Sequence, residues 1–489
     1  MHLVRGLAIL VASLRLAVAQ EIFDIWQTLH DQSSLFSPLN LSQPVTFTTV
    51  SSPVPADITI DETTSYQTVK GFGATLTDSS AQSLSNLKTQ NSTAYWELLK
   101  KLFDPAFDAS SAGISYLRVS LGASDFSATA YSYDDNPGDT SLSKFNIDAA
   151  PSYVFEVLND IQDINNILKV HVVPWSPPGW MKDSGTVNGG NFLSNMSDTY
   201  AHYLLMALQG FESKGVHVYA ISIQNEVLNT NPTLPSCKMT YQDEGAIGKV
   251  LRPLMNSNGF TSVKLIGFEH NWSSYQYPIS LMGNFSDVFD GVAFHCYGGT
   301  VDDQDKFYQA YPNKDMYFTE CTGMDGSDWW GDVQWQAENL FIGSIEHHAQ
   351  TALLWNLISG AELPGASSCS GKDGQRNQCR AVVTLDPNNS TYVLNQEYYN
   401  VAQASRAVLP RDAGGAFGKL ISSSVAPGNR TAGLRVNAYA TTRVNKSDPT
   451  RYSLHVLNMA DTGPHTVEFQ GRQLSYNFPV GLTTLWFYA

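Results

Sequence analysis

Residues 216–224, with the sequence VHVYAISIQ, form a short apolar run, and Asn225 and Glu226 follow it directly. Longer stretches with helical periodicity lie on either side, at Tyr200–Lys214 and Ala246–Met255. Apolar runs that alternate with amphipathic helices are typical of parallel βαβ units. We therefore predict that residues 216–224 form one strand of an α/β fold.

The same alternation recurs from about Phe72 to Asn356. Further helical patterns are Ala94–Leu102 and Tyr153–Ile167. Eight strand–helix units over roughly 290 residues favour a (β/α)₈ TIM barrel over an open sheet. The predicted strands are Val69–Leu76, Ile114–Leu121, Val170–Trp175, Val216–Gln224, Val263–Phe268, Gly291–Tyr297, Met316–Glu320 and Thr351–Leu357.

The C-terminal part differs, because from about Gly414 short alternating runs are separated by turn residues. This pattern predicts an antiparallel β-sandwich. Val45–Ile60 has the same β character, and since an isolated hairpin would be marginal, we expect it to join the C-terminal sheet. We predict a signal peptide at 1–19, an N-terminal sandwich segment at 20–66, the barrel at 67–410 and the remaining sandwich at 411–489.

Composition limits the function classes. Of the 489 residues, 43% are hydrophobic and 15% are charged, and the formal net charge is -16. A nucleic-acid-binding protein needs a positive surface, so we expect no nucleic-acid partner. Anionic membrane surfaces are disfavoured for the same reason. We expect a soluble monomer with a core large enough for a barrel and an accessory domain.

The first residues resemble a secretory signal. A weakly positive start precedes an apolar stretch at 6–18, and AVA at 17–19 fits a cleavage site that leaves Gln20 first. The stretch is shorter than the about 20 residues of a membrane span. We therefore expect secretion to the extracellular space. Nine N-x-[ST] sequons support export: Asn40, Asn91, Asn195, Asn271, Asn284, Asn388, Asn389, Asn429 and Asn445.

Two carboxylates stand where a barrel enzyme places its chemistry, at the C-terminal ends of the strands. Glu226 ends the fourth apolar run and Glu320 the seventh, and across a closed barrel they can face each other. A lone Glu at a strand end more often pairs with a neighbouring cation. Two carboxyls about 5–5.5 Å apart, however, supply a nucleophile and an acid/base that cleave glycosides with retention.

Other residues fit this reaction. The acid needs a raised pKa, which we expect from burial and from the nearby nucleophile. Arg118 and His295 are placed to give the nucleophile positive charge or hydrogen bonds. Asn225 can bind a sugar hydroxyl next to the reacting carbon. The mechanism needs no cofactor and no C-x-x-C pair or His cluster has zinc spacing, so we expect neither cofactor nor metal.

Aromatic residues at the strand ends and in the loops beyond them fit a sugar ligand, because flat ring faces stack on the C–H faces of pyranoses. A single Trp is more often part of the core. The adjacent pair Trp329-Trp330 in a Gly/Asp-containing loop is better explained as partly exposed. The candidates are Trp175, Trp180, Trp272, Tyr297, Trp329, Trp330 and Trp355.

In this order, the motifs resemble those of glycoside hydrolase family 30, over nearly the whole chain after the signal. The resemblance implies a retaining enzyme with a barrel and a β-sandwich, with Glu226 as acid/base and Glu320 as nucleophile. It also implies that Asp125, Trp175, Asn225, His295 and Tyr297 surround the sugar. The motifs are Gly71-Phe72-Gly73-Ala74, Ala123-Ser124-Asp125-Phe126, Trp175-Ser176-Pro177, Gln224-Asn225-Glu226, His295-Cys296-Tyr297 and Thr319-Glu320.

The chain departs from the family pattern at Val227, where the family usually has Pro, and this change could relax the position of the acid. Of the five cysteines, Cys369 and Cys379 bracket a polar loop where a disulfide is natural. Cys296 and Cys321 follow site positions on neighbouring strands and could form a disulfide or be two buried thiols. An odd count leaves at least one thiol unpaired within the chain.

The chain looks most like the fungal secreted members, among which endo-β-1,6-glucanases are prominent. We therefore expect internal cleavage of β-1,6-glucan. The same chemistry on β-1,6-galactan or xylan is an alternative, as is a glucosylceramidase-like activity, for which the chain shows no lipid-facing amphipathic segment. A non-catalytic carbohydrate-binding protein would be expected to lack one of the two Glu residues, and both are present.

Overall fold

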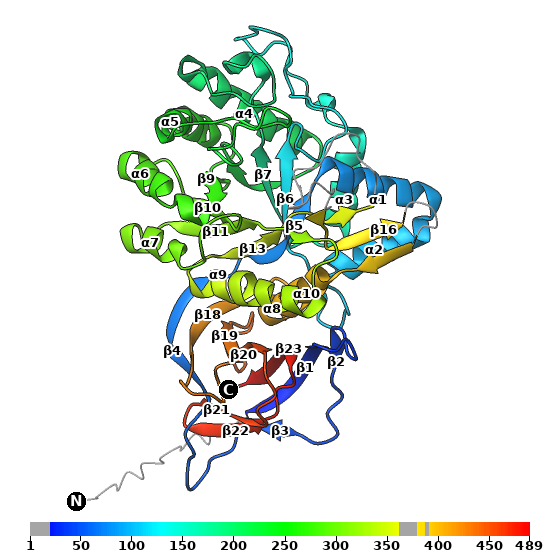
Figure 1. Cartoon of the computed structure of the whole chain (residues 1–489), viewed down its shortest axis with the longest axis vertical. Coiled ribbons are helices and arrows are strands. Elements are labelled where there is room, and N and C mark those ends of the chain that lie inside the picture. Colours follow the sequence, from blue (N-terminus) through cyan, green and yellow to red (C-terminus); the bar gives the residue numbers. More distant parts are fainter. Residues whose placement is uncertain (1–19, 361–378, 387–390) are drawn as a thin grey trace, which may run out of the picture.

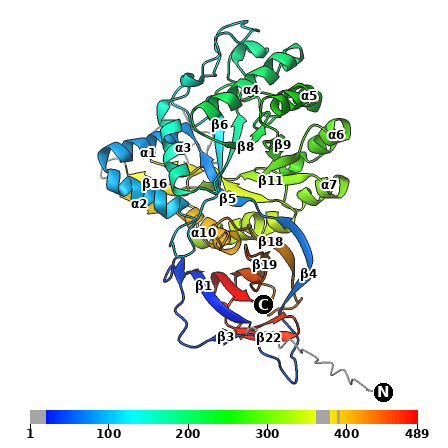
Figure 2. The same ribbon diagram turned by 180° about the vertical axis from the view of Figure 1, so that it is seen from behind.

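The computed structural model describes residues 20–360, 379–386 and 391–489. The predicted signal peptide, Cys369 and the sequons Asn388 and Asn389 lie outside the described residues. Figures 1 and 2 show a barrel surrounded by helices and, at one side of it, a domain of strands that contains the C-terminus. Within the described residues, the helices are too short or too polar to cross a membrane.

The barrel is one parallel sheet in the strand order β11-β10-β9-β8-β7-β6-β5-β13. Its two edges meet, because the Gln350 N–H donates to the Met316 carbonyl (2.8 Å) and the Phe318 N–H to Thr351 Oγ1 (3.2 Å). The predicted barrel is confirmed. Its strands are β5 Gly71–Leu76, β6 Tyr116–Leu121, β7 Lys169–Pro174, β8 Val218–Ser222, β9 Lys264–Asn271, β10 Gly291–His295, β11 Asp315–Glu320 and β13 Thr351–Leu354.

Helices connect the strands and cover the outside of the barrel (Figure 1). Leu98 and Leu102, one turn apart on α2, are fully buried, as expected for an amphipathic helix that packs on a sheet. Thr240 and Asp243 form a capping box at the start of α5. The helices are α1 Asp78–Gln90, α2 Ser92–Phe103, α3 Ser152–Ile164, α4 Ser197–Ser213, α5 Tyr241–Ser257, α6 Gln276–Phe285, α7 Asp303–Ala310, α8 Trp329–Gln336, α9 Gly343–Glu346 and α10 Gln396–Val408.

The second domain is a sheet in the order β2-β1-β23-β20-β19-β18-β4-β21-β22, and β3 pairs with β1. Phe469 of β21 packs on Tyr452 of β20 (4.9 Å between ring centroids) and on Phe487 of β23 (5.1 Å). Because several strands separate these residues in the sheet order, the sheet folds over into two layers, as in a sandwich. The strands are β1 Glu21–Leu29, β2 Ser37–Pro38, β3 Val45–Thr46, β4 Ile58–Thr68, β18 Lys419–Val425, β19 Leu434–Thr441, β20 Arg451–Asn458, β21 His465–Phe469, β22 Arg472–Tyr476 and β23 Gly481–Tyr488.

The N-terminal segment joins the C-terminal strands, as predicted, but it contributes more strands to the sheet than Val45–Ile60 alone. Val45–Ile60 supplies β3 and the start of β4. The longer β1 was not predicted, and it pairs with β23 from the other end of the chain, as Figure 2 shows. Two smaller sheets join β12 Gly323–Met324 to β15 Cys379–Arg380, and β14 Ile358–Ser359 to β16 Val383–Asp386 and β17 Thr391–Leu394.

The α10 helix and the segment that follows it bind the barrel to the sheet domain. The Asp24 carboxylate of β1 accepts hydrogen bonds from Arg406 Nη2 (3.0 Å) and Arg411 Nη2 (2.8 Å). Trp486 Nε1 donates to the Arg406 carbonyl (2.9 Å), and the Arg406 guanidinium lies 4.3 Å from the Trp26 ring centroid. These largely buried contacts dock the two domains.

The cysteines resolve one alternative that the sequence left open. Cys296 and Cys321 form a disulfide between the ends of β10 and β11. Cys379 is also disulfide-bonded. Cys237 is a buried free thiol.

Candidate active site

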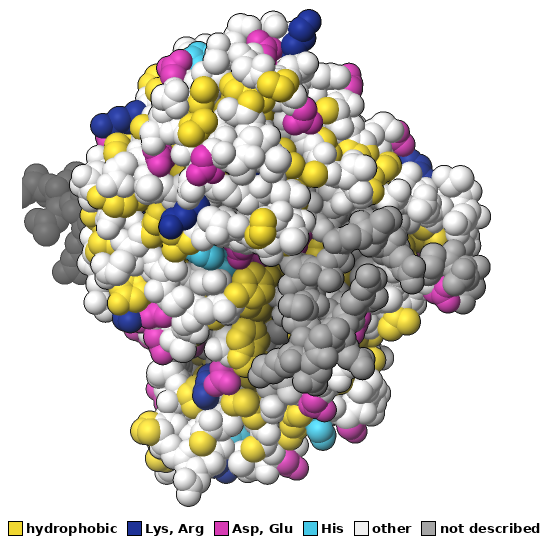
Figure 3. Space-filling view, turned by 45° about the horizontal axis from the view of Figure 1, so that its top comes forward, with side chains coloured by type: hydrophobic (Ala, Val, Ile, Leu, Met, Phe, Trp, Pro, Cys, Tyr) yellow, Lys and Arg dark blue, Asp and Glu magenta, His cyan; other side chains and the backbone are white. Residues whose placement is uncertain are grey.

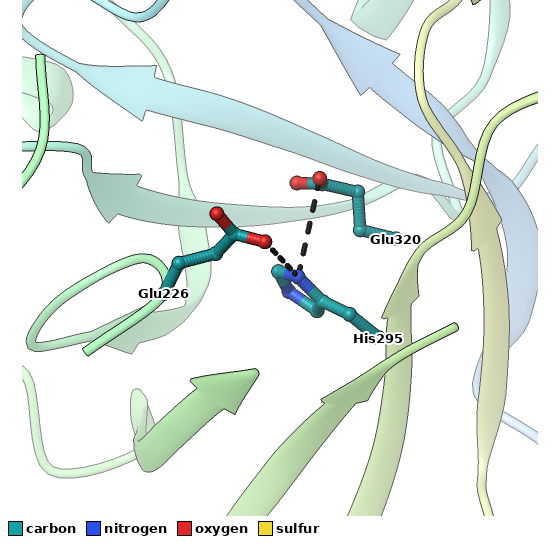
Figure 4. Close-up of side chains that lie close together, drawn as sticks. All are labelled: Glu226, His295 and Glu320. Carbon is teal, nitrogen blue, oxygen red and sulfur yellow. Dashed lines mark ion pairs between the residues drawn. The ribbon is translucent and has the colours of Figure 1, made fainter. Parts of the chain in front are cut away.

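Five of the eight barrel strands, β6 and β8 to β11, deliver polar side chains to the C-terminal end of the barrel. Figure 4 shows that the carboxylates of Glu226 and Glu320 point toward each other, with the imidazole of His295 beside both. The polar residues of this end are Arg118 on β6, Asn225 and Glu226 after β8, Glu269 on β9, His295 on β10 and Glu320 on β11.

The two predicted catalytic carboxylates lie close together. One ligand atom each of Glu226, His295 and Glu320 all lie within 4.8 Å of one another. His295 Nδ1 is 3.6 Å from Glu226 Oε1 and 3.9 Å from Glu320 Oε1. Retaining glycosidases have carboxyl groups about 5–5.5 Å apart and inverting ones about 6.5–9.5 Å, so this spacing fits retention.

The same three residues have the spacing of metal ligands. Arg118 Nη1, however, is 2.6 Å from Glu320 Oε2, and both side chains are almost fully buried. A permanent cation bound to one of the three ligands would repel a metal ion placed among them. We therefore assign the group to carboxylate chemistry.

Glu320, at the end of β11, is oriented through both of its oxygens. Arg118 Nη1 donates to Oε2 at 2.6 Å and the Tyr297 hydroxyl donates to Oε1 at 3.0 Å. Charge-assisted hydrogen bonds of this kind are strong and directional. Arg118, predicted to act on the nucleophile, and Tyr297, predicted to surround the sugar, thus both hold Glu320 in one orientation.

The backbone of Glu226, which follows β8, has φ 45°. Residues other than glycine rarely adopt this left-handed conformation. The Glu226 N–H donates to the Glu269 carbonyl (2.8 Å), and Asn229 Nδ2 donates to Glu226 Oε2 (2.8 Å). Val227, where we expected a looser loop, is fully buried, and its carbonyl accepts from the Met239 N–H (2.8 Å). The loop that carries Glu226 is therefore fixed by contacts on both sides.

The predicted rise in the pKa of Glu226 is wrong for the unliganded site. Burial raises this pKa, but the positive imidazole of His295 and the nearby His270 outweigh burial and lower it to about 2. Burial lowers the pKa of His295, whereas the charge of Glu320 and hydrogen bonds with Glu226 and Glu269 raise it to about 9. The prediction considered the nucleophile beside the acid and left out the cation between them.

Glu269 is a site residue that the sequence analysis did not assign. In the pairing of β9 with β10, Ala293 is opposite Phe268 and Phe294 is opposite His270, so Glu269 is bulged out of the ladder. Its φ is 104°. A bulge re-aims a side chain. The residue does follow an apolar run, which is the signal that singled out Glu226 and Glu320.

The fully buried carboxylate of Glu269 lies at the centre of the hydrogen-bond network. It accepts from Arg118 Nη2 (3.0 Å), Ser222 Oγ (2.7 Å) and Thr319 Oγ1 (2.8 Å), and His295 Nε2 lies at 3.1 Å. Burial raises its pKa, but the Arg118 guanidinium and the His295 imidazole hold it well below its usual range. Glu269 therefore fixes both cations that contact or face Glu320.

Two of the predicted tryptophans lie beside the cation of the site. The Arg118 guanidinium is 4.7 Å from the Trp175 ring centroid, and the Trp175 ring is 5.3 Å from that of Trp355. Phe126 meets Trp355 edge to face at 5.1 Å. Arg118 Nη2 also donates to Asn225 Oδ1 at 2.5 Å, which fixes the amide next to the acid.

Tyr297 and Asp125 complete the predicted group. Tyr297 as a whole is 44% exposed, although its hydroxyl is bound to Glu320. Burial of the hydroxyl and the charges of Glu320, Glu226 and Asp125 raise the pKa of Tyr297 well above its usual value. Asp125, half-buried in the loop after β6, is therefore close enough to act on this site.

Other predicted aromatics lie elsewhere. Trp272 is fully buried and donates to Gln304 Oε1 (2.9 Å), so it belongs to the core and the expectation that it meets the sugar is wrong. Trp180 is half-buried and donates to the Asp134 carbonyl (2.9 Å). Trp329 and Trp330 begin α8 and pack against a cluster that includes residues of the sheet domain, Leu457 and Leu482. The structure does not bring this pair to the carboxylates.

Comparison with known proteins agrees with this geometry. The model of the glycosyl hydrolase family 30 TIM-barrel domain matches residues 69–337, over half of the chain. The chain belongs to glycosyl hydrolase family 30. It is therefore a glycoside hydrolase, and its substrate is a carbohydrate.

Relatives within family 30 are similar over most of the chain. Endo-1,6-beta-D-glucanase BGN16.3 of Trichoderma harzianum is 30% identical over 77% of each chain. An endo-1,6-beta-D-glucanase of Neurospora crassa is 32% identical over 71% of this chain and 72% of the relative. The solved structure of the endo-beta1,6-glucanase BT3312 has a TM-score of 0.79 at 24% identity and covers 95% of this chain and 98% of that chain, which shows the shared fold.

Proposed function

We propose that this family 30 enzyme cleaves β-1,6-glucan internally and with retention, with Glu320 as nucleophile and Glu226 as acid/base. The observation that carries the mechanism is the pair of opposed carboxylates, grouped with His295 within 4.8 Å. Similarity to two fungal endo-1,6-beta-D-glucanases, at 30% and 32% identity, supports the choice of polymer.

In the first step, an oxygen of Glu320 attacks the anomeric carbon, and the bond from that carbon to the leaving oxygen breaks as Glu226 gives the leaving oxygen a proton. Arg118 and Tyr297 orient the attacking carboxylate at 2.6 and 3.0 Å. Asn225, whose amide is fixed by Arg118, is placed to bind the hydroxyl next to the reacting carbon. In the second step, Glu226 takes a proton from a water molecule as the water oxygen bonds to the anomeric carbon, and the bond from that carbon to Glu320 breaks.

Glu226 must hold a proton before the first step, although in the unliganded site its pKa is lowered to about 2. A sugar ring that enters beside Glu226 weakens its contact with His295, now 3.6 Å, and displaces water. Both changes raise the pKa of a carboxyl group. Substrate binding thus raises the pKa of Glu226. We therefore expect the protein to take up a proton from solution when a neutral ligand binds.

Separate substitutions test the two roles. Glu320→Ala should abolish turnover, and azide should restore it as a glycosyl azide of inverted configuration, because azide replaces the missing nucleophile. Glu226→Ala should lose far more activity on glucan than on an aryl glycoside whose leaving group needs no proton. Wild-type turnover by Glu320→Ala, or equal losses of Glu226→Ala on both substrates, would refute the assignment concerned.

A product profile tests the substrate. The purified protein is incubated with β-1,6-glucan, β-1,6-galactan, xylan and a glucosyl lipid, and the products are separated over time. A ladder of β-1,6-linked gluco-oligosaccharides supports internal cleavage of glucan, whereas glucose alone from the start contradicts internal cleavage. Faster release from galactan, xylan or the lipid would replace the substrate and leave the catalytic pair in place.

A neutral glycan also fits the surface. On the face shown in Figure 3, Lys and Arg side chains stand singly among polar and hydrophobic ones. A nucleic acid would need a continuous basic stripe. Together with the net charge of -16, this supports the expectation that nucleic acid is not a partner.

We also propose that the protein is secreted and glycosylated. Six of the sequon asparagines in the described residues are exposed, whereas Asn271 is half-buried and its Oδ1 accepts from the Tyr297 N–H (3.1 Å). We expect glycans on exposed sites and none on Asn271. Peptide mass spectrometry of the protein from a secreting host, after enzymatic deglycosylation in heavy-oxygen water, checks this, and a glycan on Asn271 would contradict it. The exposed sites are Asn40, Asn91, Asn195, Asn284, Asn429 and Asn445.

A further inference from the structure

A covalent bond joins the two strand ends that carry the nucleophile and the central histidine. Cys296 directly follows His295 on β10, and Cys321 directly follows Glu320 on β11. The disulfide between them therefore lies one residue beyond the site on both strands. Tyr297, whose hydroxyl donates to Glu320 at 3.0 Å, follows Cys296.

The same disulfide lies at an irregular point of the barrel. From Gly291 to Phe294 the β10 residues pair in step with β11, but His295 then lies opposite Glu320 instead of Thr319. Beyond this shift, the Cys296 N–H donates to the Glu320 carbonyl at 3.2 Å. A bulge locally disrupts the hydrogen-bond ladder, and a slip of one residue turns every side chain to the other face.

A slip or loosening here would move the reacting groups themselves. Glu320 and two of the side chains beside it, His295 and Tyr297, lie within two residues of a bonded cysteine. Arg118, which also holds Glu320, comes from β6 on the far side of the barrel and cannot correct the pairing of β10 with β11. Misplacement of a reacting group by about 1 Å can lower a rate about a hundredfold.

We propose that the Cys296–Cys321 disulfide is a positioning element of the active site, which holds β10 and β11 in the shifted register that aims His295, Tyr297 and Glu320. The inference rests on the proposed role of Glu320. Reduction by a small dithiol breaks the S–S bond, gives two thiols and oxidises the dithiol to its own disulfide. Cys296 is only half-buried, so such a reagent can reach it. Reduction is therefore expected to lower turnover reversibly.

The test compares wild type with C296S/C321S, which removes both sulfurs so that no stray thiol remains. We expect kcat on the best glycan to fall about ten- to a hundredfold while KM changes less than about twofold, because the sugar-binding residues outside β10 and β11 stay in place. Wild type treated with dithiothreitol should show the same fall and recover on reoxidation. C237S, which loses only the free buried thiol, serves as the matched control.

Dithiothreitol also reaches the disulfide of Cys379, so treatment of C296S/C321S measures that contribution by itself and should cause no further fall in kcat. If C296S/C321S fails to fold, reversible loss of kcat in reduced wild type, with an unchanged near-ultraviolet circular dichroism spectrum, carries the test. A folded C296S/C321S with wild-type kcat and only a lower melting temperature would overturn the proposal and leave the proposed function intact. An oxidised wild type that cleaves no glycan would refute the proposed function, and this inference with it.

Discussion

Charge balance at the base of the site depends on a single buried residue. The cations Arg118 and His295 face three carboxylates, those of Glu226, Glu269 and Glu320. A buried charge is costly unless it is paired and hydrogen-bonded, and removal of one partner leaves the other uncompensated. Glu269 is the member that binds both cations without facing the substrate, so it can be changed without removal of a reacting group.

Glu269→Gln keeps the shape of the side chain and removes its charge. We expect kcat/KM to fall at least about tenfold, because Arg118 and His295 lose the group that positions them. Glu269 helps to raise the pKa of His295, so without it that pKa falls and the pH dependence that reports on His295 moves to lower pH. The pH profiles of kcat and kcat/KM, measured for variant and wild type, check this.

Two controls separate this role from catalysis and from general damage. Azide should not rescue Glu269→Gln, in contrast to Glu320→Ala, since the nucleophile is still present. Glu244→Gln removes a neighbouring buried carboxylate that binds the Phe268 N–H, and it should keep near wild-type kcat. Superimposable pH profiles of Glu269→Gln and wild type would contradict the role given to Glu269.

These residues also show what the sequence can predict about a site. Glu226, His295 and Glu320 were found because each ends an apolar run, and strand ends meet at one rim of a barrel. Glu269 also follows an apolar run, but the sequence does not reveal the bulge that turns its side chain into the site. The low pKa of Glu226 depends on contacts across three strands, which no local pattern contains.

Among the elements, α5 and β9 are joined by a titrating contact. Glu244, in the first turn of α5, is fully buried, and its Oε1 accepts from the Phe268 N–H at 2.8 Å, directly before the bulge. Burial raises the pKa of Glu244 to about 7. The contact thus supports the end of β9 that carries Glu269. Because Glu244 is buried, its carboxyl group resists ionisation.

The raised pKa makes stability depend on pH. The folded state favours the protonated carboxyl group of Glu244. The contribution of Glu244 to the stability of the fold is therefore complete below its unfolded pKa of about 4.3 and is lost as pH rises through about 7. We expect Glu244→Gln, which keeps the acceptor oxygen, to raise the melting temperature at pH 8 relative to wild type and to leave it nearly unchanged at pH 4. Thermal unfolding at both values checks the sign, and a larger gain at pH 4 would contradict it.

Many elements were predictable, since each barrel strand is a short apolar run and the period of four segments predicted α2, α3, α4 and α5. β1 was not predicted because Asp24 and other polar residues interrupt the apolar pattern of EIFDIWQTL. The charge is tolerated there because Arg406 and Arg411, almost four hundred residues further along the chain, bind it. The local sequence of either segment does not predict an ion pair between segments so far apart in the chain.

At the scale of the whole molecule, the junction of the barrel and the sheet domain determines where Trp329 and Trp330 pack. Trp329 and Trp330 were predicted to meet substrate because two adjacent tryptophans in a polar loop suggest exposure. In the fold, α8 directs them to the apolar cluster shared with the sheet domain, where the Trp330 ring lies 6.0 Å from that of His30. Both residues are half-buried, as expected of a partly exposed pair, but the sequence does not show that they pack at a domain junction. A sugar contact by this pair stays a prediction.

The same junction offers a test of how the domains hold each other. Asp24→Asn leaves Arg406 and Arg411 buried without their negative partner, and breaking such a buried pair costs about 3–5 kcal/mol. Glu338→Gln is the matched control, because Glu338 pairs with Arg435 across the same junction but both side chains are more than a third exposed, and such a pair contributes less than about 1 kcal/mol. We expect a clear fall in melting temperature for Asp24→Asn alone, with kcat at 25 °C unchanged because the contact is remote from the carboxylates. Equal melting temperatures of the two variants would show that the buried ion pair does not dock the sheet domain. A fall in kcat without a fall in melting temperature would instead mean that the junction acts on the active site through the barrel.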